Sequence, residues 1–138
     1  NGNSAIAGDL VAACKDACGS TAHLKVILET GRLQTATAIA GSSRDAIAAG
    51  ADFIKTSTGK TPVSATLEAA HIMLEAIRDS GKTVGLKPSG GIRTTEQALA
   101  YLRLADNIMG AGWATPETFR FGASSLLDAL LKTLGQKG

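Results

Sequence analysis

The hydrophobic pattern along the chain alternates between helical spacing and short apolar runs. Five segments place apolar residues at helical spacing, and four short runs between them have the composition of buried strands. The expected helices cover 4–18, 33–49, 64–79, 94–104 and 124–134, and the expected strands cover 24–29, 53–57, 83–89 and 120–122. This α(βα)4 order predicts a single α/β domain over 1–138, with parallel strands joined by helical crossovers.

Two of the expected helices carry local signals. The helix over 33–49 is expected to be interrupted at Gly41-Ser42-Ser43, because glycine and serine weaken helices. The helix over 94–104 begins with TTEQ, which fits a capping box with Thr94 as N-cap and Gln97 as the third helical residue.

Two lysines near strand ends are the strongest chemical signal. Lys55 lies in FIKTS and Lys87 in VGLKPS, and each precedes a loop that contains glycine. Because side chains alternate along a strand, both should share one face with Lys25. Burial and neighbouring cations lower a lysine pKa from about 10.4, and a neutral amine is what Schiff-base chemistry requires. The alternative is a pair of lysines that extend along the surface to solvent.

Glu29 is expected on the same face as Lys25 and is the only inward carboxylate near the lysines. It is a candidate general base. The simpler interpretation, which we favour at this stage, is that it is a counter-ion for Lys25.

Two glycine-containing loops precede expected helices. They are GGIR at 90–93 and GASS at 122–125. Exposed N–H groups at a helix N-terminus bind anions, and glycine allows a close approach, so the pair predicts a phosphate site. Ordinary strand-to-helix turns remain the alternative.

Composition excludes several classes of function. With 44% hydrophobic residues the chain can form a packed core, and a net charge of +2 without a basic run gives no support for nucleic-acid binding. No apolar stretch is long enough to span a membrane. Cys14 and Cys18 are expected to be small buried thiols in a reducing compartment, which favours a cytoplasmic protein. We expect no metal and no cofactor.

Four segments of the chain resemble, in the same order, motifs of the deoxyribose-phosphate aldolase family. They are LKVILETGRL, GADFIKTSTGK, VGLKPSGGIRT and RFGASSLL, and the resemblance covers essentially the whole chain. It implies a TIM (βα)8 barrel and a lyase of the class I, Schiff-base type. The implied reaction is the reversible cleavage of 2-deoxyribose 5-phosphate to glyceraldehyde 3-phosphate and acetaldehyde.

The resemblance also implies roles for individual residues. Lys55 would form the Schiff base, Lys87 would lower its pKa, and Lys25 would lie inside the barrel on the family's fifth strand. The residues expected around the phosphate of a phosphorylated sugar or aldehyde are Gly59, Lys60, Gly90, Gly91, Arg93, Gly122, Ser124 and Ser125.

The chain matches only the second half of that barrel. The first four strands, an aspartate of the third strand that takes part in proton transfer, and a C-terminal tyrosine have no counterpart. A (βα)4 half-barrel leaves two bare edges and one open face, so we expect a two-fold partner that closes an eight-stranded barrel, or a complementary N-terminal half.

Three functions therefore stay open. The chain could be a Schiff-base aldolase, a non-catalytic half-barrel that dimerises and binds phosphate, or a fragment of a full-length aldolase. The third is favoured by the first residue, which is Asn1 and not methionine.

Overall fold

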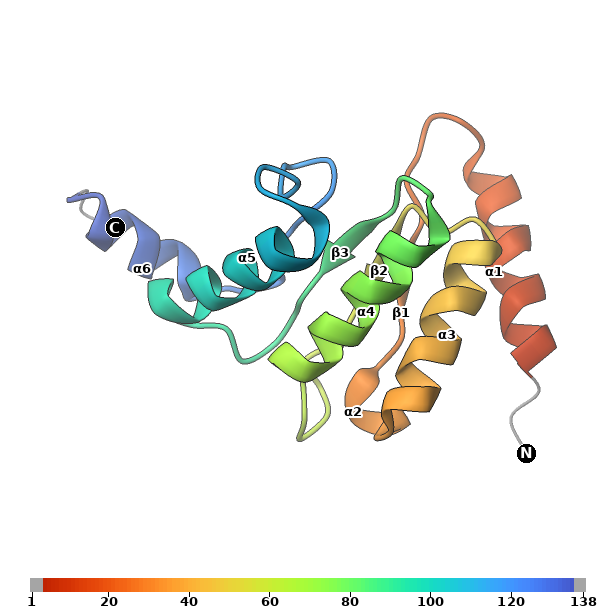
Figure 1. Ribbon diagram of the computed structural model, residues 1–138, viewed down its shortest axis with the longest axis horizontal. Helices are drawn as coiled ribbons and strands as arrows, with labels where there is room; N and C mark the ends of the chain where they lie inside the picture. The colour runs from red at the N-terminus through yellow and green to blue at the C-terminus, as the bar shows by residue number, and fades with distance from the viewer. Residues whose placement is uncertain (1–3, 136–138) are drawn as a thin grey trace.

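A three-stranded parallel sheet forms the centre of the fold. The computed structural model describes residues 4–135. Its strands are β1 (Lys25–Ile27), β2 (Phe53–Lys55) and β3 (Gly85–Lys87), in the order β1-β2-β3. The expected parallel sheet is confirmed, and helical crossovers connect its strands (Figure 1).

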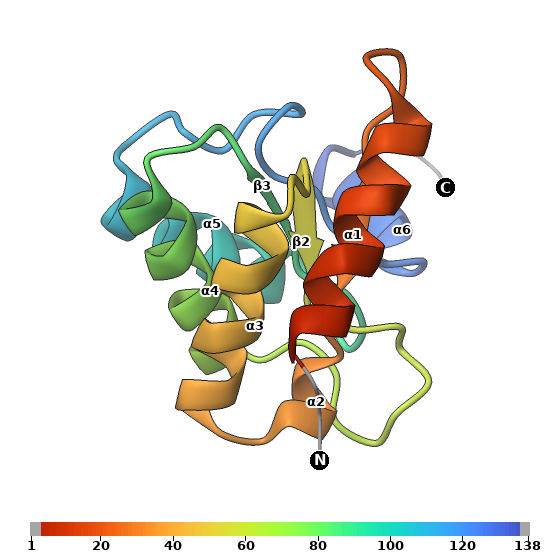
Figure 2. The same cartoon turned by 90° about the vertical axis from the view of Figure 1, so that its right-hand side faces the viewer.

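Helices cover one face of this sheet. The helices are α1 (Ser4–Cys18), α2 (Thr30–Leu33), α3 (Ala36–Ala48), α4 (Leu67–Ser80), α5 (Thr95–Met109) and α6 (Leu126–Thr133). In Figure 2, α3, α4 and α5 lie together on one side of the strands, and α1 runs beside α3. The core lies between sheet and helices, where Ile54 and Leu86 pack with Leu74 and Ile77 of α4, all four at most 1% exposed.

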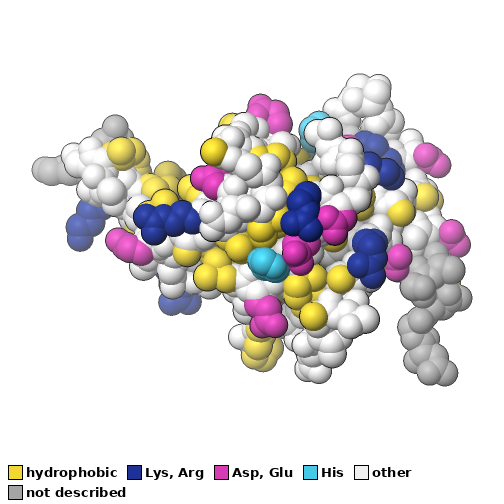
Figure 3. Space-filling model, viewed as in Figure 1, with side chains coloured by type: hydrophobic (Ala, Val, Ile, Leu, Met, Phe, Trp, Pro, Cys, Tyr) yellow, Lys and Arg dark blue, Asp and Glu magenta, His cyan; other side chains and the backbone are white. Residues whose placement is uncertain are grey.

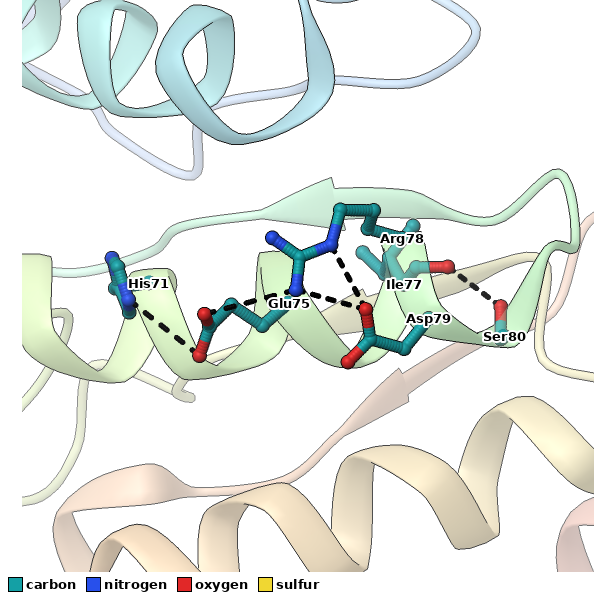
Figure 4. Close-up of polar contacts among 6 residues, drawn as sticks. All are labelled: His71, Glu75, Ile77, Arg78, Asp79 and Ser80. Atoms are coloured by element: carbon teal, nitrogen blue, oxygen red, sulfur yellow. Dashed lines mark hydrogen bonds and ion pairs between the residues drawn. The ribbon is translucent and has the colours of Figure 1, made fainter.

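The outer surface of these helices mixes charged and hydrophobic side chains (Figure 3). On α4, His71 pairs with Glu75 at 3.5 Å, and Arg78 pairs with Asp79 at 2.9 Å (Figure 4). Charged side chains of both signs are scattered over this face and are not gathered into one patch (Figure 3). The helical face therefore offers no obvious charged binding surface, and the open face of the sheet is the place to look for chemistry.

The expected helix over 33–49 was wrong in its start and in its interruption. Helix α2 ends at Leu33, Gln34 adopts a left-handed conformation, and Thr35 caps a new helix by accepting a hydrogen bond from the Ala38 N–H at 3.2 Å. Helix α3 then runs through Gly41–Ser43 without a break. The Ser43 hydroxyl donates to the Ile39 carbonyl at 2.7 Å, which satisfies it within the helix.

The fourth expected strand, 120–122, is reduced to two isolated bridges, Leu86 to Phe119 and Ser89 to Gly122. Its hydrogen bonds still follow the parallel pattern: the Leu86 N–H donates to the Thr118 carbonyl, and the Gly122 N–H donates to the Pro88 carbonyl, both at 2.8 Å. Pro88 has no N–H, so one bond of this ladder cannot form and the strand is interrupted there.

The cysteines differ from the expectation that both are buried. Cys14 is exposed and Cys18 is half-buried, both as free thiols on α1. Helix α1 is bound to the sheet elsewhere: Lys15 pairs with Asp52 at 2.7 Å, and the same carboxylate accepts the Leu24 N–H at 2.7 Å.

Candidate active site

Strand register places the predicted lysines on one face of the sheet. Lys55 of β2 stands directly opposite Lys87 of β3, while Lys25 of β1 stands opposite Phe53. Because every second side chain of a strand points to the same face, these residues share the face that the helices leave open. The predicted grouping of Lys25, Lys55 and Lys87 therefore agrees with the register of the described strands.

The electrostatics of this face are strongest at Lys87. Burial lowers the pKa of its ammonium, and the neighbouring charges of Lys55, Lys25 and Arg120 lower the pKa further. Arg120 was missed from the sequence as a member of this group. Its position two residues before Gly122, in an expected strand, was the available signal, because alternation puts both on one face.

An aromatic ring lies among these cations. Phe53 is 1% exposed although it belongs to the open face. The Lys25 Nζ lies 5.0 Å and the Arg120 Cζ 4.6 Å from the centre of its ring, both within cation–π range. Gly85 makes room for the ring, since a Cβ there would lie 2.2 Å from it. Phe53 thus places a buried apolar ring next to these cations.

Glu29 is not brought to the lysines. It lies two residues beyond the end of β1 with a left-handed backbone (φ 55°), so strand alternation does not determine its direction. Its carboxylate accepts hydrogen bonds from Thr58 and Thr61, and the Thr58 hydroxyl is the main reason why its pKa is lowered. Within residues 4–135 it forms no ion pair with Lys25, so the counter-ion interpretation was wrong, and we do not propose it as a base.

A cavity of about 320 Å³ lies where three loops meet. The first loop follows β2, the second follows β3, and the third follows the segment 119–122, which lies beside β3. The cavity is lined by most of the residues expected around a phosphate: Gly59, Gly90, Gly91, Arg93, Gly122, Ser124 and Ser125, together with Thr58, Ser89, Ile92 and Ala123. Lys25 and Lys60 do not line it. Residues far apart in sequence thus meet as the glycine loops predicted.

The cavity is rich in available backbone donors. In the described part of the chain, no hydrogen bond uses the N–H of Gly59, Gly91 or Ser124. Gly91 has a φ of 84°, a conformation that glycine adopts without strain. The predicted capping box is confirmed: Thr94 and Gln97 satisfy each other's backbone groups. Helix α5 begins at Thr95, directly after the GGIR loop that lines the cavity. Free N–H groups at a helix N-terminus suit an anion.

Metal and membrane sites receive no support from the described residues. Across 4–135, no cluster of three or more His, Cys, Asp or Glu side chains is arranged to hold a metal ion. None of the helices described is both long and apolar enough to cross a membrane.

Comparison with known proteins decides the family. A family model described as DeoC/LacD family aldolase matches residues 2–132. The chain belongs to this aldolase family. The predicted resemblance is confirmed by a relative named deoxyribose-phosphate aldolase, from Agrobacterium fabrum, which is 58% identical over 133 residues. That match covers 96% of this chain but 51% of the relative, so the chain spans about half the length of the aldolase it matches.

Solved structures of the aldolase family give the same picture. A protein from Coccidioides immitis, assigned as a deoxyribose-phosphate aldolase, superposes with a TM-score of 0.77 at 34% identity, over 96% of this chain and 47% of that one. A protein from Toxoplasma gondii with the same assignment has a TM-score of 0.82 at 28% identity, over 94% and 54% of the two chains. The DeoC aldolase fold is therefore shared across the described domain.

Proposed function

We propose that this chain is the lysine-bearing half of a class I, Schiff-base aldolase that acts on 2-deoxyribose 5-phosphate or a similar phosphorylated sugar. The observation that carries the proposal is the register of β2 and β3, which sets Lys55 directly opposite Lys87 on the open face of the sheet. Membership of the aldolase family supports the same chemistry.

Lys55 is the proposed nucleophile. Its Nζ forms a bond to the carbonyl carbon of an aldehyde substrate, and the carbonyl oxygen leaves as water after it has gained two protons. Lys87 is the neighbouring amine. Because burial and three nearby cations lower its pKa, it loses its proton more readily than an isolated lysine and can exchange protons beside the forming imine.

The proposed phosphate cavity adjoins these lysines. Gly122 lines the cavity, and a Cβ built on it would lie 3.1 Å from the Lys87 Cε. A sugar phosphate could therefore place its phosphate among the loops while its carbonyl carbon lies at the lysine pair. Arg93 and the free N–H groups of the loops would hold the phosphate.

The experiment is reductive trapping. The protein is incubated with acetaldehyde and sodium borohydride, and the modified lysine is identified by peptide mass spectrometry. We expect one ethyl group on Lys55, none in Lys55→Met, and a slower reaction in Lys87→Met. Lys82→Met is the matched control, because Lys82 contacts the carbonyl oxygens of Ile47 and Ala48, away from the strands that carry Lys55 and Lys87. Equal labelling of several exposed lysines would refute the proposal.

A non-catalytic, phosphate-binding half-barrel is the second candidate. It is favoured by two observations: the Glu29 carboxylate is bound by Thr58 and Thr61, and no carboxylate contributes to the pKa shift of Lys87. An active centre without a nearby carboxylate would lack about 10²–10⁴-fold of acid–base catalysis. Phosphate binding without any reducible imine would support this second function.

We also propose that a further set of strands covers the open face. Ile27 remains 43% exposed on β1, and β1 is an edge of the sheet. The occupant is a second copy of this chain or a complementary N-terminal half. A second copy would double the number of cations at the lysine face, so electrostatics favours a half that supplies carboxylates. Native mass spectrometry separates a homodimer from a complex of two different chains.

A further inference from the structure

The carboxylate of Glu29 binds the loop that follows β2. In this loop, Thr58 to Thr61 (loop 58–61), the Thr58 N–H donates to Glu29 Oε2 at 3.1 Å and the Thr58 hydroxyl donates to the same oxygen. The Thr61 hydroxyl lies 3.2 Å from Oε1 and 2.7 Å from the Val63 carbonyl, so its single proton is divided between these two acceptors. Thr58 is thus the main attachment of loop 58–61 to Glu29, and Thr61 is a weaker second one. Hydrogen bonds to a charged acceptor are the stronger kind.

The hydrogen bonds from Glu29 also affect the residues between Thr58 and Thr61. The Lys60 N–H donates to the Thr58 hydroxyl oxygen at 3.2 Å, which continues the network from Glu29. Gly59, enclosed between Thr58 and Lys60, adopts a φ of 82° and leaves its N–H without a partner in the described structure. A Cβ built on Gly90 would lie 3.4 Å from the Gly59 Cα, so loop 58–61 packs on the GGIR loop.

We infer that Glu29 is a positioning residue of the proposed phosphate site, where it holds loop 58–61 so that Thr58 and Gly59 form one wall of the cavity. Glu29 has a left-handed backbone just beyond β1, and its side chain reaches this loop through Thr58. The inference rests on the proposed function, because it assigns Glu29 to the affinity for phosphate and not to the imine chemistry.

The direction in which phosphate affinity changes when Glu29 is neutralised separates a positioning role from simple charge repulsion. A carboxylate near an anion site repels the anion, so neutralising it should strengthen phosphate binding. If Glu29 positions the wall of the cavity, neutralising it should weaken binding, because the hydrogen bonds that anchor the loop lose their charged acceptor. Glu96 is the matched control: it is an exposed glutamate in the first turn of α5, next to the GGIR loop, and its carboxylate bonds within its own helix start, to Thr94.

The experiment is a titration with inorganic phosphate at constant ionic strength, followed by calorimetry or phosphorus NMR. We expect Glu29→Gln to bind phosphate about tenfold more weakly than the wild type, because a neutral amide oxygen is a weaker acceptor for the two Thr58 hydrogen bonds than a carboxylate. Glu96→Gln should bind as tightly or more tightly. Thr58→Val should weaken binding as Glu29→Gln does, while Thr58→Ser, which keeps the hydroxyl, should restore it.

A second readout follows loop 58–61 without any ligand. Amide hydrogen exchange of Lys60 should be about tenfold faster in Glu29→Gln, because its acceptor, the Thr58 hydroxyl, is no longer fixed. Unchanged exchange at Lys60, or phosphate binding by Glu29→Gln as tight as that of the wild type, would overturn the inference. Absence of phosphate binding by the wild type would overturn it together with the phosphate part of the proposed function. Imine trapping at Lys55 would still test the lysine chemistry separately.

Discussion

Substitution of Gly122 by alanine tests how the proposed phosphate loop is packed against the lysine strand. Gly122 does not have a positive φ, so alanine leaves the backbone unstrained and the effect comes from the added methyl group alone. That Cβ would lie 2.2 Å from the Ser89 Oγ, 2.7 Å from the Ser89 Cβ and 3.1 Å from the Lys87 Cε. Ordinary contacts begin near 3.4 Å, so all three are too short.

Ser89 cannot move away freely. It is 6% exposed, its N–H donates to the Thr56 hydroxyl oxygen at 3.0 Å, and its own hydroxyl donates to the Gly122 carbonyl at 3.3 Å. A rotation of the hydroxyl would relieve the first contact but not the second. Overpacking typically costs about 1–3 kcal/mol and the lost hydrogen bond about 0.5–1.5 kcal/mol. Gly122→Ala should therefore lower the free energy of unfolding by about 2–4 kcal/mol.

Urea unfolding measures this change, and the neighbouring serine supplies the control. Ser89→Ala removes only the hydroxyl, so the 2.7 Å contact remains and Gly122→Ala should stay destabilising in that background. Ser89→Gly removes both contacts, and there the cost of Gly122→Ala should fall below about 1 kcal/mol. Gly41→Ala, a helical glycine without any atom within 4 Å of its built Cβ, should instead stabilise by about 0.5–1 kcal/mol.

Two results would refute the packing argument. One is a Gly122→Ala variant within about 0.5 kcal/mol of the wild type, the usual range for uncrowded surface positions. The other is equal destabilisation by Gly122→Ala in the Ser89→Gly background and in the wild type, which would show that the two positions do not interact.

Three further predictions concern stability. Lys87 has a folded-state pKa below its ordinary 10.5, so folding disfavours its ammonium form. Lys87→Met should therefore be more stable than the wild type at neutral pH, and the difference in unfolding free energy should shrink as the pH rises toward 10.5. A difference that does not change with pH in urea unfolding would contradict this. Thr94→Ala removes the cap of α5 and should lower the free energy of unfolding by about 1 kcal/mol, measured in urea. An unchanged free energy would show that the capping box does not contribute to stability. Asp52→Ala should cost about 1–3 kcal/mol in thermal unfolding, since it leaves the Leu24 N–H unpaired. Lys15→Ala removes only the ion pair and should cost less than about 1 kcal/mol. A larger cost for Lys15→Ala than for Asp52→Ala would contradict the view that Asp52 acts mainly as the acceptor for Leu24.

The sequence alone determined the alternation of helices with three parallel strands and the placement of the lysines on one face. Hydrophobic spacing is a local property, and it located the parallel strands and the helices that cross between them. Alternation along β2 and β3 predicted that Lys55 and Lys87 share a face, and a period of two residues is independent of the rest of the fold. The capping box at Thr94 was also readable, because its partners lie within four residues.

The tertiary structure decided the contacts that bring distant segments together. Glu29 was expected to face the lysines, but β1 ends before it and the loop after β2 provides better partners for its carboxylate. Phe53 became a buried member of the open face only because Gly85, on the next strand, leaves space for its ring. Such outcomes depend on which hydrogen-bond donors and which surfaces lie opposite a residue, and folding determines these through contacts that no local pattern contains.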